Sequence, residues 1–420
     1  RTMANRSSQK KSSKAELAGA LFGTGISAKP KKSEDREFKF WSTQPVPKLA
    51  EKPTGHGPID RIKTVDEVPA EPIPLPENFY WEDFNLDEDS QVKEIYKLLT
   101  QHYVEDDDNM FRFDYSQKFL KWALKTPNYR KDWHVGIRTR PKGKLVACIT
   151  AVPAHIKVYD EVIPMCEINF LCIHKKLRNK RLAPVLIKEI TRRVNRADRW
   201  QAVYTAGVVL PKPVSQNRYY HRSLNPKKLI DIGFSRLSPK LTISSTIRLY
   251  RLPEVPQIPT FKPLTEKHIP GAHKLLSEYL KRFKLHTQFS LEEFRHCLLP
   301  REDVISSYIV TNPETGEVTD LVSYYKLPSS VINNKKYKLL NAAYSFYNVA
   351  TSVSWPVLMK DALIVAKQEG FDVFNALDVM ENEDFLSLLK FGAGDGHLQY
   401  YLFNWKCPEV KPSETGIVLL

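Results

Sequence analysis

The stretch Glu167-Ile168-Asn169-Phe170-Leu171-Cys172-Ile173-His174 decides the fold, together with the basic turn and the helix that follow it. Its apolar, β-prone residues predict a buried strand over about 165–173. Apolar side chains then recur with helical spacing at Ala183, Leu186, Ile187, Ile190 and Val194. This spacing predicts an amphipathic helix over about 182–196. Pro184 falls in its first turn, where a missing N–H is tolerated.

The turn between this strand and this helix predicts an anion-binding site. A helix N-terminus presents backbone N–H groups without partners and the positive end of the helix dipole. Four cationic side chains approach the same place: Lys175, Arg178, Lys180 and Arg181. Together they can bind a phosphate-bearing ligand. A plain solvated basic face remains the alternative from the turn alone.

The distribution of charge favours a small polyphosphate ligand over a nucleic-acid duplex. The net charge of +15 is concentrated in two segments, residues 1–39 and residues 174–199, whose net charges are +6 and +8. A tail and one focused patch do not form a face that follows a duplex. The sequence therefore predicts no requirement for nucleic acid.

Cysteine content and hydropathy limit the cell compartment and the class of protein. The five cysteines form no C-x-x-C pair, so we expect neither a disulfide framework nor a metal site. This usage fits a reducing compartment, and we expect a cytoplasmic protein. No apolar run approaches the ~18 residues of a membrane span.

The chain predicts a mixed α/β fold built from two halves. We expect a disordered basic tail at 1–37, because that segment lacks apolar periodicity. A helix is predicted at 91–103 and strands at 133–138, 144–151, 202–209 and 228–235. Beyond residue 240, helices are predicted at 266–283, 290–298 and 355–369, and strands at 304–311, 319–326, 338–344, 371–376 and 398–404.

Several long motifs resemble the protein N-myristoyltransferase family. The segments EINFLCIHK (167–175) and KFGAGDG (390–396) are similar to its two signatures, FWSTQPVP (40–47) to its CoA-covering segment, and YVEDDDNMFRF (103–113) to its acidic peptide-binding loop. The resemblance covers residues 38–420, with minor departures at Asn179 and Tyr220. It implies two pseudo-symmetric Gcn5-related halves in one compact unit: an acyl-CoA-binding half at 38–225 and a peptide-binding half at 226–420.

The resemblance implies transfer of myristate from myristoyl-CoA to the α-amine of an N-terminal glycine, without a metal. The residues that it assigns to the acyl-CoA are Phe40, Trp41, Phe170, Leu171, Cys172, Ile173, Arg178, Asn179, Lys180, Arg181, Leu182, Ala183 and Pro184. The backbone N–H groups of Phe170 and Leu171 are expected to form an oxyanion hole. Two amides released from ladder pairing at a strand break can point at one oxygen. An ordinary core strand is the alternative.

The chain end is the candidate catalytic base. Gly416-Ile417-Val418-Leu419-Leu420 is apolar, whereas termini are usually polar and frayed. We therefore expect Leu420 to be tucked inside, and the resemblance implies that its carboxylate takes the proton of the amine. An α-carboxyl titrates at roughly 3.5 and an α-amine at roughly 8, a gap that burial narrows. A strand that only completes a sheet is the alternative.

Recognition of the peptide is assigned by the same resemblance. Asn169 and Thr205 are expected to orient the glycine amine. The peptide-binding residues are expected to be Tyr103, Asp106, Asp108, Phe111, Gly207, Tyr219, His221, Tyr344, Asp395 and Gly396. We interpret His221 as a hydrogen-bonding wall and not as a general base. A nucleophilic pair of Cys172 and His174 is disfavoured because it lacks a third, orienting group.

Two other functions compete with this interpretation. One is a lysine acetyltransferase of the Gcn5-related superfamily, which the second half and the segment 40–47 disfavour. The other is a non-enzymatic basic protein that binds ribosomes or nucleic acid through residues 1–37. We expect a monomer that acts on glycine peptides or nascent proteins, with ribosome association as an added role of the tail.

Overall fold

The computed structural model describes residues 38–61, 63–105 and 109–420. The predicted disordered tail at 1–37 and the predicted peptide contacts Asp106 and Asp108 lie outside the described residues.

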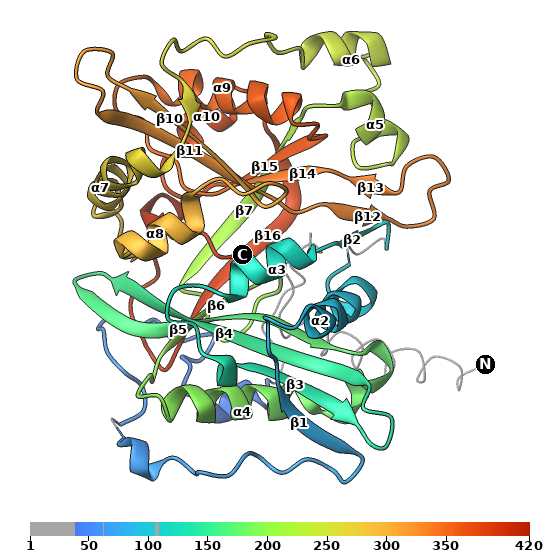
Figure 1. Cartoon of the computed structure of the whole chain (residues 1–420), viewed down its shortest axis with the longest axis vertical. Coiled ribbons are helices and arrows are strands. Elements are labelled where there is room, and N and C mark those ends of the chain that lie inside the picture. The colour runs from blue at the N-terminus through green and yellow to red at the C-terminus, as the bar shows by residue number, and fades with distance from the viewer. Residues whose placement is uncertain (1–37, 62, 106–108) are drawn as a thin grey trace.

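One mixed 14-stranded sheet runs through the molecule (Figure 1). Its strands follow in the spatial order β1 (Phe79–Asp83), β3 (His134–Thr139), β4 (Leu145–Val158), β5 (Glu161–Ile173), β6 (Ala202–Ala206), β16 (Gly392–Phe403), β7 (Ser215–Ser223), β15 (Val373–Leu377), β14 (Ala342–Ser345), β11 (Val318–Lys326), β10 (Ile305–Thr311) and β8 (Lys262–Pro263). Strand β9 (Leu285–Thr287) joins β4 to β17 (Thr415–Gly416). A small second sheet contains β13 (Leu339–Leu340), β12 (Ser329–Val331) and β2 (Phe111–Phe113).

The strand order repeats itself across the centre of the sheet. On one side, β1, β3, β4 and β5 form an antiparallel ladder, and β5 then pairs with β6 in parallel. On the other side, β8, β10, β11 and β14 form an antiparallel ladder, and β14 pairs with β15 in parallel. Parallel neighbours need a crossover connection, which α4 and α9 supply. The fold therefore contains two pseudo-symmetric halves in one sheet.

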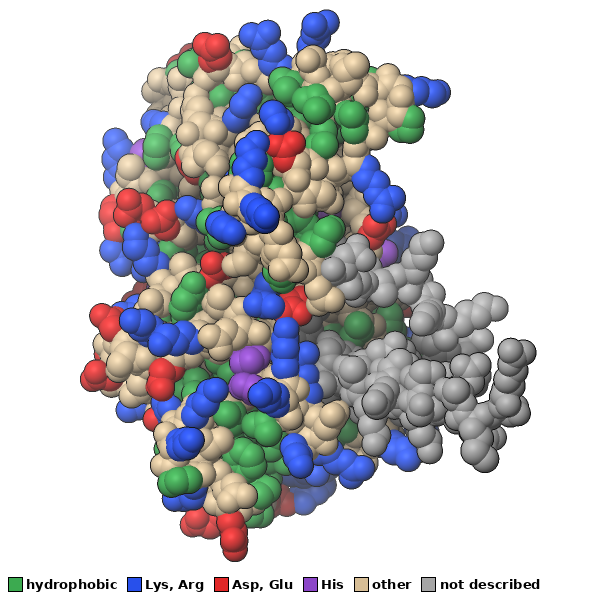
Figure 2. Space-filling model, turned by 90° about the vertical axis from the view of Figure 1, so that its right-hand side faces the viewer, with side chains coloured by type: hydrophobic (Ala, Val, Ile, Leu, Met, Phe, Trp, Pro, Cys, Tyr) green, Lys and Arg blue, Asp and Glu red, His purple; other side chains and the backbone are tan. Residues whose placement is uncertain are grey.

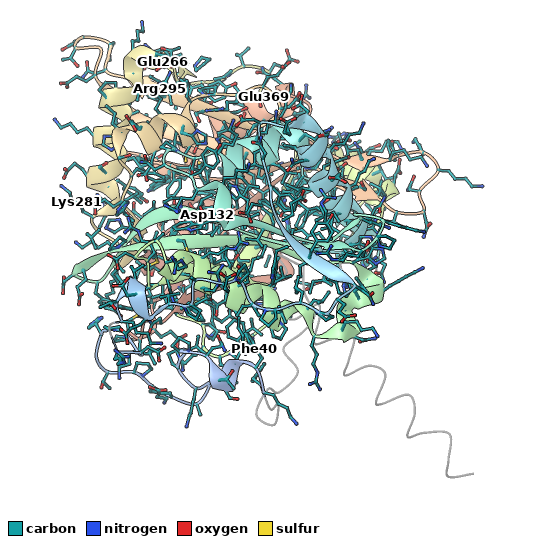
Figure 3. All side chains as sticks on the ribbon, turned by 60° about the horizontal axis from the view of Figure 1, so that its bottom comes forward. Phe40, Asp132, Glu266, Lys281, Arg295 and Glu369 are labelled. Carbon is teal, nitrogen blue, oxygen red and sulfur yellow. The ribbon has the colours of Figure 1, made fainter. Side chains whose placement is uncertain are left out.

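Helices cover both faces of the sheet. They are α2 (Asp89–His102), α3 (Gln117–Leu124), α4 (Leu182–Asn195), α5 (Pro226–Asp231), α6 (Ile243–Leu249), α7 (Ile269–Leu280), α8 (Leu291–Leu298), α9 (Trp355–Gln368) and α10 (Glu383–Leu386). In the first half, α4 covers one face of β3 to β5, and α2 and α3 cover the other (Figure 1). Figure 3 shows Phe40 at one edge of the molecule and, at the opposite edge, the ion pair between Glu266, which precedes α7, and Arg295 in the last turn of α8.

The mixed α/β class is confirmed, as are the strand β5 and the helix α4 around the basic turn. The predicted strand at 228–235 is wrong, because that region begins with α5. Asn225 caps this helix by accepting a hydrogen bond from the Lys228 N–H at 3.3 Å, and Pro226 occupies its first position. Most of the signature segment 390–396 belongs to β16, which begins at Gly392 and has a register shift between Ala393 and His397.

Candidate functional site

A β-bulge interrupts the pairing of β4 with β5 at the predicted oxyanion hole. Cys148 pairs with Cys172 and Thr150 pairs with Asn169, so one residue of β4 faces Phe170 and Leu171 together. Phe170 has a left-handed backbone with φ of 50°. On its other side, β5 pairs with β6 only at Cys166 and Glu167. The strand therefore breaks its ladders at the residues predicted to bind an oxyanion.

The side chain of Asn169 connects this bulge to the end of the chain. Its Oδ1 accepts a hydrogen bond from the Phe170 N–H at 2.9 Å. Its Nδ2 donates to the main-chain oxygen of Leu420 at 2.6 Å. One amide therefore contacts a predicted oxyanion donor and the predicted base at the same time, although Asn169 and Leu420 are 251 residues apart in sequence.

The apolar end of the chain packs inside the molecule as its composition indicates. Ile417, Val418 and Leu419 are buried, and Leu420 is partly buried. The Val418 N–H donates to the Tyr347 hydroxyl at 3.1 Å. Upstream, β17 pairs with β9 and brings the end of the chain to the first half of the sheet.

Glu167 is a second carboxyl group at this site. Burial raises its pKa to about 7, against the opposing effects of the Leu420 N–H and the Asn169 side-chain amide, which donate toward it. The Oε1 of Glu167 lies 3.5 Å from the Asn169 Nδ2. Glu167 therefore contacts both Leu420, which carries the predicted base, and the Asn169 amide, which orients that base.

A small apolar pocket lies beside the bulge, between the sheet and α4. Its walls come from the segment before β1, β4 to β6, α4 and β16: Trp41, Ile149, Cys166, Ile168, Ile187, Ile190, Thr191, Val194, Asn195, Trp200, Gln201, Ala202, Tyr204 and Phe403. The Trp41 ring stacks on Tyr204 with 5.9 Å between centroids. An elongated apolar group such as an acyl chain fits the chemistry of these walls.

The basic turn forms the 3-10 helix η4 (Lys175–Lys180), and α4 begins after Arg181, which has φ of 57°. Arg178 donates to the carbonyl of Ile173 at 3.4 Å and also to the carbonyl of His102. Lys175 is paired with Glu105. Lys180 and Arg181 are exposed at the start of α4. Asn179 lies in η4, and Leu182, Ala183 and Pro184 form the first turn of α4.

An aromatic path leads from the bulge to the predicted peptide-binding residues. The Tyr103 ring lies 6.1 Å from the ring of Phe170 and 5.8 Å from that of Tyr115. The path continues through Phe113 to Tyr344, whose ring lies 6.1 Å from Tyr219. The sheet thus brings Tyr103, Tyr219 and Tyr344 to one side of the bulge from three distant parts of the sequence.

His221 and the glycine-rich start of β16 form a second part of this wall. Nδ1 of His221 lies 2.6 Å from Oδ1 of Asn375, and burial lowers the pKa of His221. A Cβ at Gly394 would lie 2.3 Å from Nε2 of His221, so only glycine fits there. Asp395 is close enough to influence the His221 pKa.

The remaining predicted residues lie around these groups. Phe111 lies 5.8 Å from Phe234, which is 5.4 Å from the His221 ring. Thr205 is on β6 opposite Tyr400, Gly207 follows the end of β6, and the buried Gly396 is on β16.

The alternative pair of Cys172 and His174 is not arranged for catalysis. Burial raises the pKa of the Cys172 thiol well above its usual range, and its Sγ donates to the carbonyl of Leu98 at 3.8 Å. The His174 ring lies 4.0 Å from that of His102. Among the described residues, no group of three or more His, Cys, Asp or Glu side chains could hold a metal ion. No helix in the same ranges is long and apolar enough to cross a membrane.

Sequence reasoning missed Glu167 and most of the apolar pocket. Glu167 had a signal, since it is a carboxylate within the apolar strand predicted at 165–173. The pocket residues had none, because core side chains and ligand-contacting side chains have the same composition.

Comparison with known proteins gives a consistent result. The family model described as "Myristoyl-CoA:protein N-myristoyltransferase, N-terminal domain" matches residues 58–217, and the C-terminal domain of the same family matches residues 231–418. Glycylpeptide N-tetradecanoyltransferase 1 of Arabidopsis thaliana is 54% identical, with 92% of this chain and 90% of that protein covered. The Drosophila melanogaster enzyme is 53% identical, with 92% and 81% covered.

A solved structure is similar over the same range. The crystal structure of Saccharomyces cerevisiae N-myristoyltransferase with bound myristoyl-CoA is 41% identical to this chain, with a TM-score of 0.88. The similarity covers 92% of this chain and 100% of that one.

Proposed function

The chain belongs to the N-myristoyltransferase family and is an acyltransferase, and from this premise we propose that it transfers myristate from myristoyl-CoA to the α-amino group of an N-terminal glycine. The observation that carries this proposal is the position of Asn169. Its amide contacts both the Phe170 N–H and the Leu420 oxygen, beside an apolar pocket.

The basic turn and the pocket bind the acyl-CoA in this proposal. The turn before α4 holds the pyrophosphate with backbone amides and with Lys180 and Arg181, since anions are stabilised at helix N-termini. The pocket takes the acyl chain, and Trp41 closes it from the N-terminal segment. The thioester carbonyl then lies at the bulge, where the Phe170 and Leu171 amides stabilise the oxyanion.

Asn169 must change partners for this oxyanion hole to work. Its Oδ1 accepts a hydrogen bond from the Phe170 N–H. When the substrate binds, the carbonyl oxygen of the thioester replaces Oδ1 as the acceptor of this hydrogen bond. The released side chain can accept a hydrogen bond from the glycine amine. Thr205 on the neighbouring β6 supports the same amine.

The carboxylate of Leu420 acts as the base. It takes one proton from the glycine ammonium, and the neutral amine attacks the thioester carbonyl. The C–N bond forms, the C–S bond breaks, and the CoA thiolate leaves and takes up the second proton, which the nitrogen loses as it becomes an amide. Glu167 has a positioning role, because it accepts the Leu420 N–H and contacts Asn169, and its raised pKa keeps it partly neutral beside the base.

The peptide enters along the aromatic path, which residues of both halves line. Tyr103, Tyr219 and His221 come from residues 38–225, and Tyr344 on β14 comes from residues 226–420. We propose residues 38–225 as the acyl-CoA-binding half and residues 226–420 as the half that completes the peptide site. The monomeric state, the cytoplasmic location and the ribosome contact of the basic tail remain proposals that rest on composition and charge.

An acyl-transfer assay with two peptides tests the function. With myristoyl-CoA, a peptide that starts with glycine should be acylated, and the same peptide starting with alanine should not. Acetyl-CoA should be a poor donor with the glycine peptide. A preference for acetyl-CoA, or modification of a lysine side chain, would show that the chain acts as a lysine acetyltransferase instead.

A further inference from the structure

The segment 236–255, which contains α6, exposes an unusual number of apolar side chains. Among the described residues, five of the nine exposed large apolar side chains lie there, and they are 37–62% exposed: Leu237, Ile243, Ile247, Leu249 and Val255. A sixth, Leu388, lies close by, because Lys390 Nζ donates to the Leu249 carbonyl at 2.9 Å. Apolar side chains that are exposed singly are common, but a cluster of this size marks an interaction site.

Over 16 residues of the same segment, all the charged side chains are basic. Residues 236–251 contain four cations and no carboxylate: Arg236, Lys240, Arg248 and Arg251. All four are exposed, and none of them forms an ion pair within the described part of the chain. The flanking Asp231 is paired with Lys227 and Lys336, and the one carboxylate within the segment, Glu254, comes after these four cations. Figure 2 shows apolar side chains gathered among Lys and Arg side chains at the top of the molecule, the end where Figure 1 places α6.

This surface is a fixed element. The side chains of Thr242 and Ser245 cap the start of α6 reciprocally, with N–H to Oγ distances of 2.8 and 3.1 Å. At its other end, the buried Arg222 donates to the Tyr250 carbonyl and stacks on the Tyr250 ring at 4.9 Å. Thr246 is the buried residue of the helix itself. The exposed apolar side chains are therefore held outward and cannot fold back into the core.

We propose that this surface, called the α6 surface and formed by residues 236–255 with Leu388 and Lys390, docks on a membrane that contains anionic phospholipids. Apolar side chains beside cations match the boundary between acyl chains and phosphate headgroups. A nucleic acid would pair with the cations but would leave Ile243, Ile247 and Leu249 without partners. The helix has seven residues, so it lies on the bilayer and does not span it.

Docking there leaves the proposed acyl-CoA site accessible. Figure 1 places α6 and α4 at opposite ends of the molecule, and the basic turn precedes α4. None of the residues of the α6 surface belongs to the pocket, the bulge or the chain end. The proposal therefore goes beyond acyl transfer and can fail or succeed independently of it.

Vesicle sedimentation of the full chain tests the proposal. The protein should bind vesicles of phosphatidylcholine with about 30 mol % phosphatidylserine and should not bind phosphatidylcholine alone. Ile247→Ser with Leu249→Ser, and separately Arg248→Glu with Arg251→Glu, should each weaken binding by about tenfold. Peptide acylation in solution should be unchanged in both variants, which shows that they fold.

Two exposed positions elsewhere serve as matched controls. Val162→Ser removes a similarly exposed apolar side chain, and Lys274→Glu reverses an exposed charge on α7. Both should bind vesicles like the parent protein. The proposal is wrong if the α6 variants bind anionic vesicles as the parent does, if phosphatidylcholine alone binds equally well, or if the segment binds RNA and not vesicles.

Discussion

Two crossovers occupy equivalent places in the two halves of the sheet. One leads from β5 through η4 and α4 to β6, and the other leads from β14 through α9 to β15 (Figure 1). Each joins a pair of parallel strands at the end of an antiparallel ladder. Each brings a loop to the N-terminus of a long helix, where backbone amides are available to an anion.

The two loops differ in the anion that their backbone amides bind, which is a ligand in one half and a side chain of the protein in the other. Residues 174–181 are rich in Lys and Arg and contain no carboxylate, whereas residues 346–354 carry no charged side chain. In the second loop, the buried Asp320 accepts hydrogen bonds from the amides of Thr351 and Ser352 at 2.8 and 3.0 Å. The second half thus supplies its own anion and gains a fixed loop. The first half leaves its amides to a ligand, and this difference explains why only one half holds the proposed acyl-CoA site.

The largest expected effect comes from removing Leu420. It would show that acyl transfer at the first crossover needs the carboxylate that the end of the second half supplies. Loss of a general base lowers turnover by about 10²–10⁴-fold. Binding of acyl-CoA should be retained, because the turn and the pocket are untouched. Single-turnover kinetics and a fluorescence binding assay measure the two quantities separately. Undiminished turnover would remove Leu420 from the mechanism.

The next effect concerns the internal anion. Asp320→Ala removes the acceptor of the Thr351 and Ser352 amides and of the Ser352 hydroxyl, and it should lower the free energy of unfolding by about 3 kcal/mol. Asp320→Asn keeps one acceptor oxygen and should lower the free energy of unfolding by less. Thermal unfolding measures both, and acyl-CoA affinity should not change. An affinity loss with normal stability would mean that the second loop also serves the ligand.

Charge reversal in the first loop should affect the ligand and not the stability. Lys180→Glu with Arg181→Glu should raise the KM for myristoyl-CoA by about tenfold, with little change in kcat. The defect should shrink as salt rises, because exposed charges are screened. Lys188→Glu, an exposed position farther along α4, is the control. Equal defects in both variants would argue against a site at the turn.

The smallest expected effect is the pH dependence set by Glu167. Its folded pKa of about 7 lies above the ordinary value of 4.5, so between these values the folded state binds more protons than the unfolded state. Stability therefore falls as pH rises through this window. In Glu167→Gln, stability should no longer fall as pH rises through this window. The effect on Tm should be a few degrees at most. Parallel pH profiles for the two proteins would disprove this linkage.

The sequence predicted the elements with strong periodicity and failed where tertiary pairing decides. The apolar strand β5 and the amphipathic helix α4 were predictable from side-chain spacing. Strand β7 was missed, because Ser215-Gln216-Asn217-Arg218-Tyr219-Tyr220-His221-Arg222-Ser223 has no apolar alternation. Its pairing with β15 and β16 on both sides overrides that polar composition.

The candidate site was predictable in its parts and not in its assembly. The basic turn had a physical signal in its charges, and the chain end had one in its apolar residues. The bulge at Phe170 had none, because one extra residue in a strand leaves no mark in composition. The contact of Asn169 with Leu420 and that of Asp320 with Thr351 depend on segments that only the folded sheet brings together.

The place of β16 has a consequence for how the chain folds. This strand is among the last to be synthesised, yet it lies between β6 and β7, which precede it by about 170 to 200 residues. The first half therefore cannot complete its sheet until residue 403 is available, and contacts of such long range make folding slow. A cut between the halves would leave β6 and β7 with open edges. The two halves resemble each other in topology, but they must fold as a single cooperative unit.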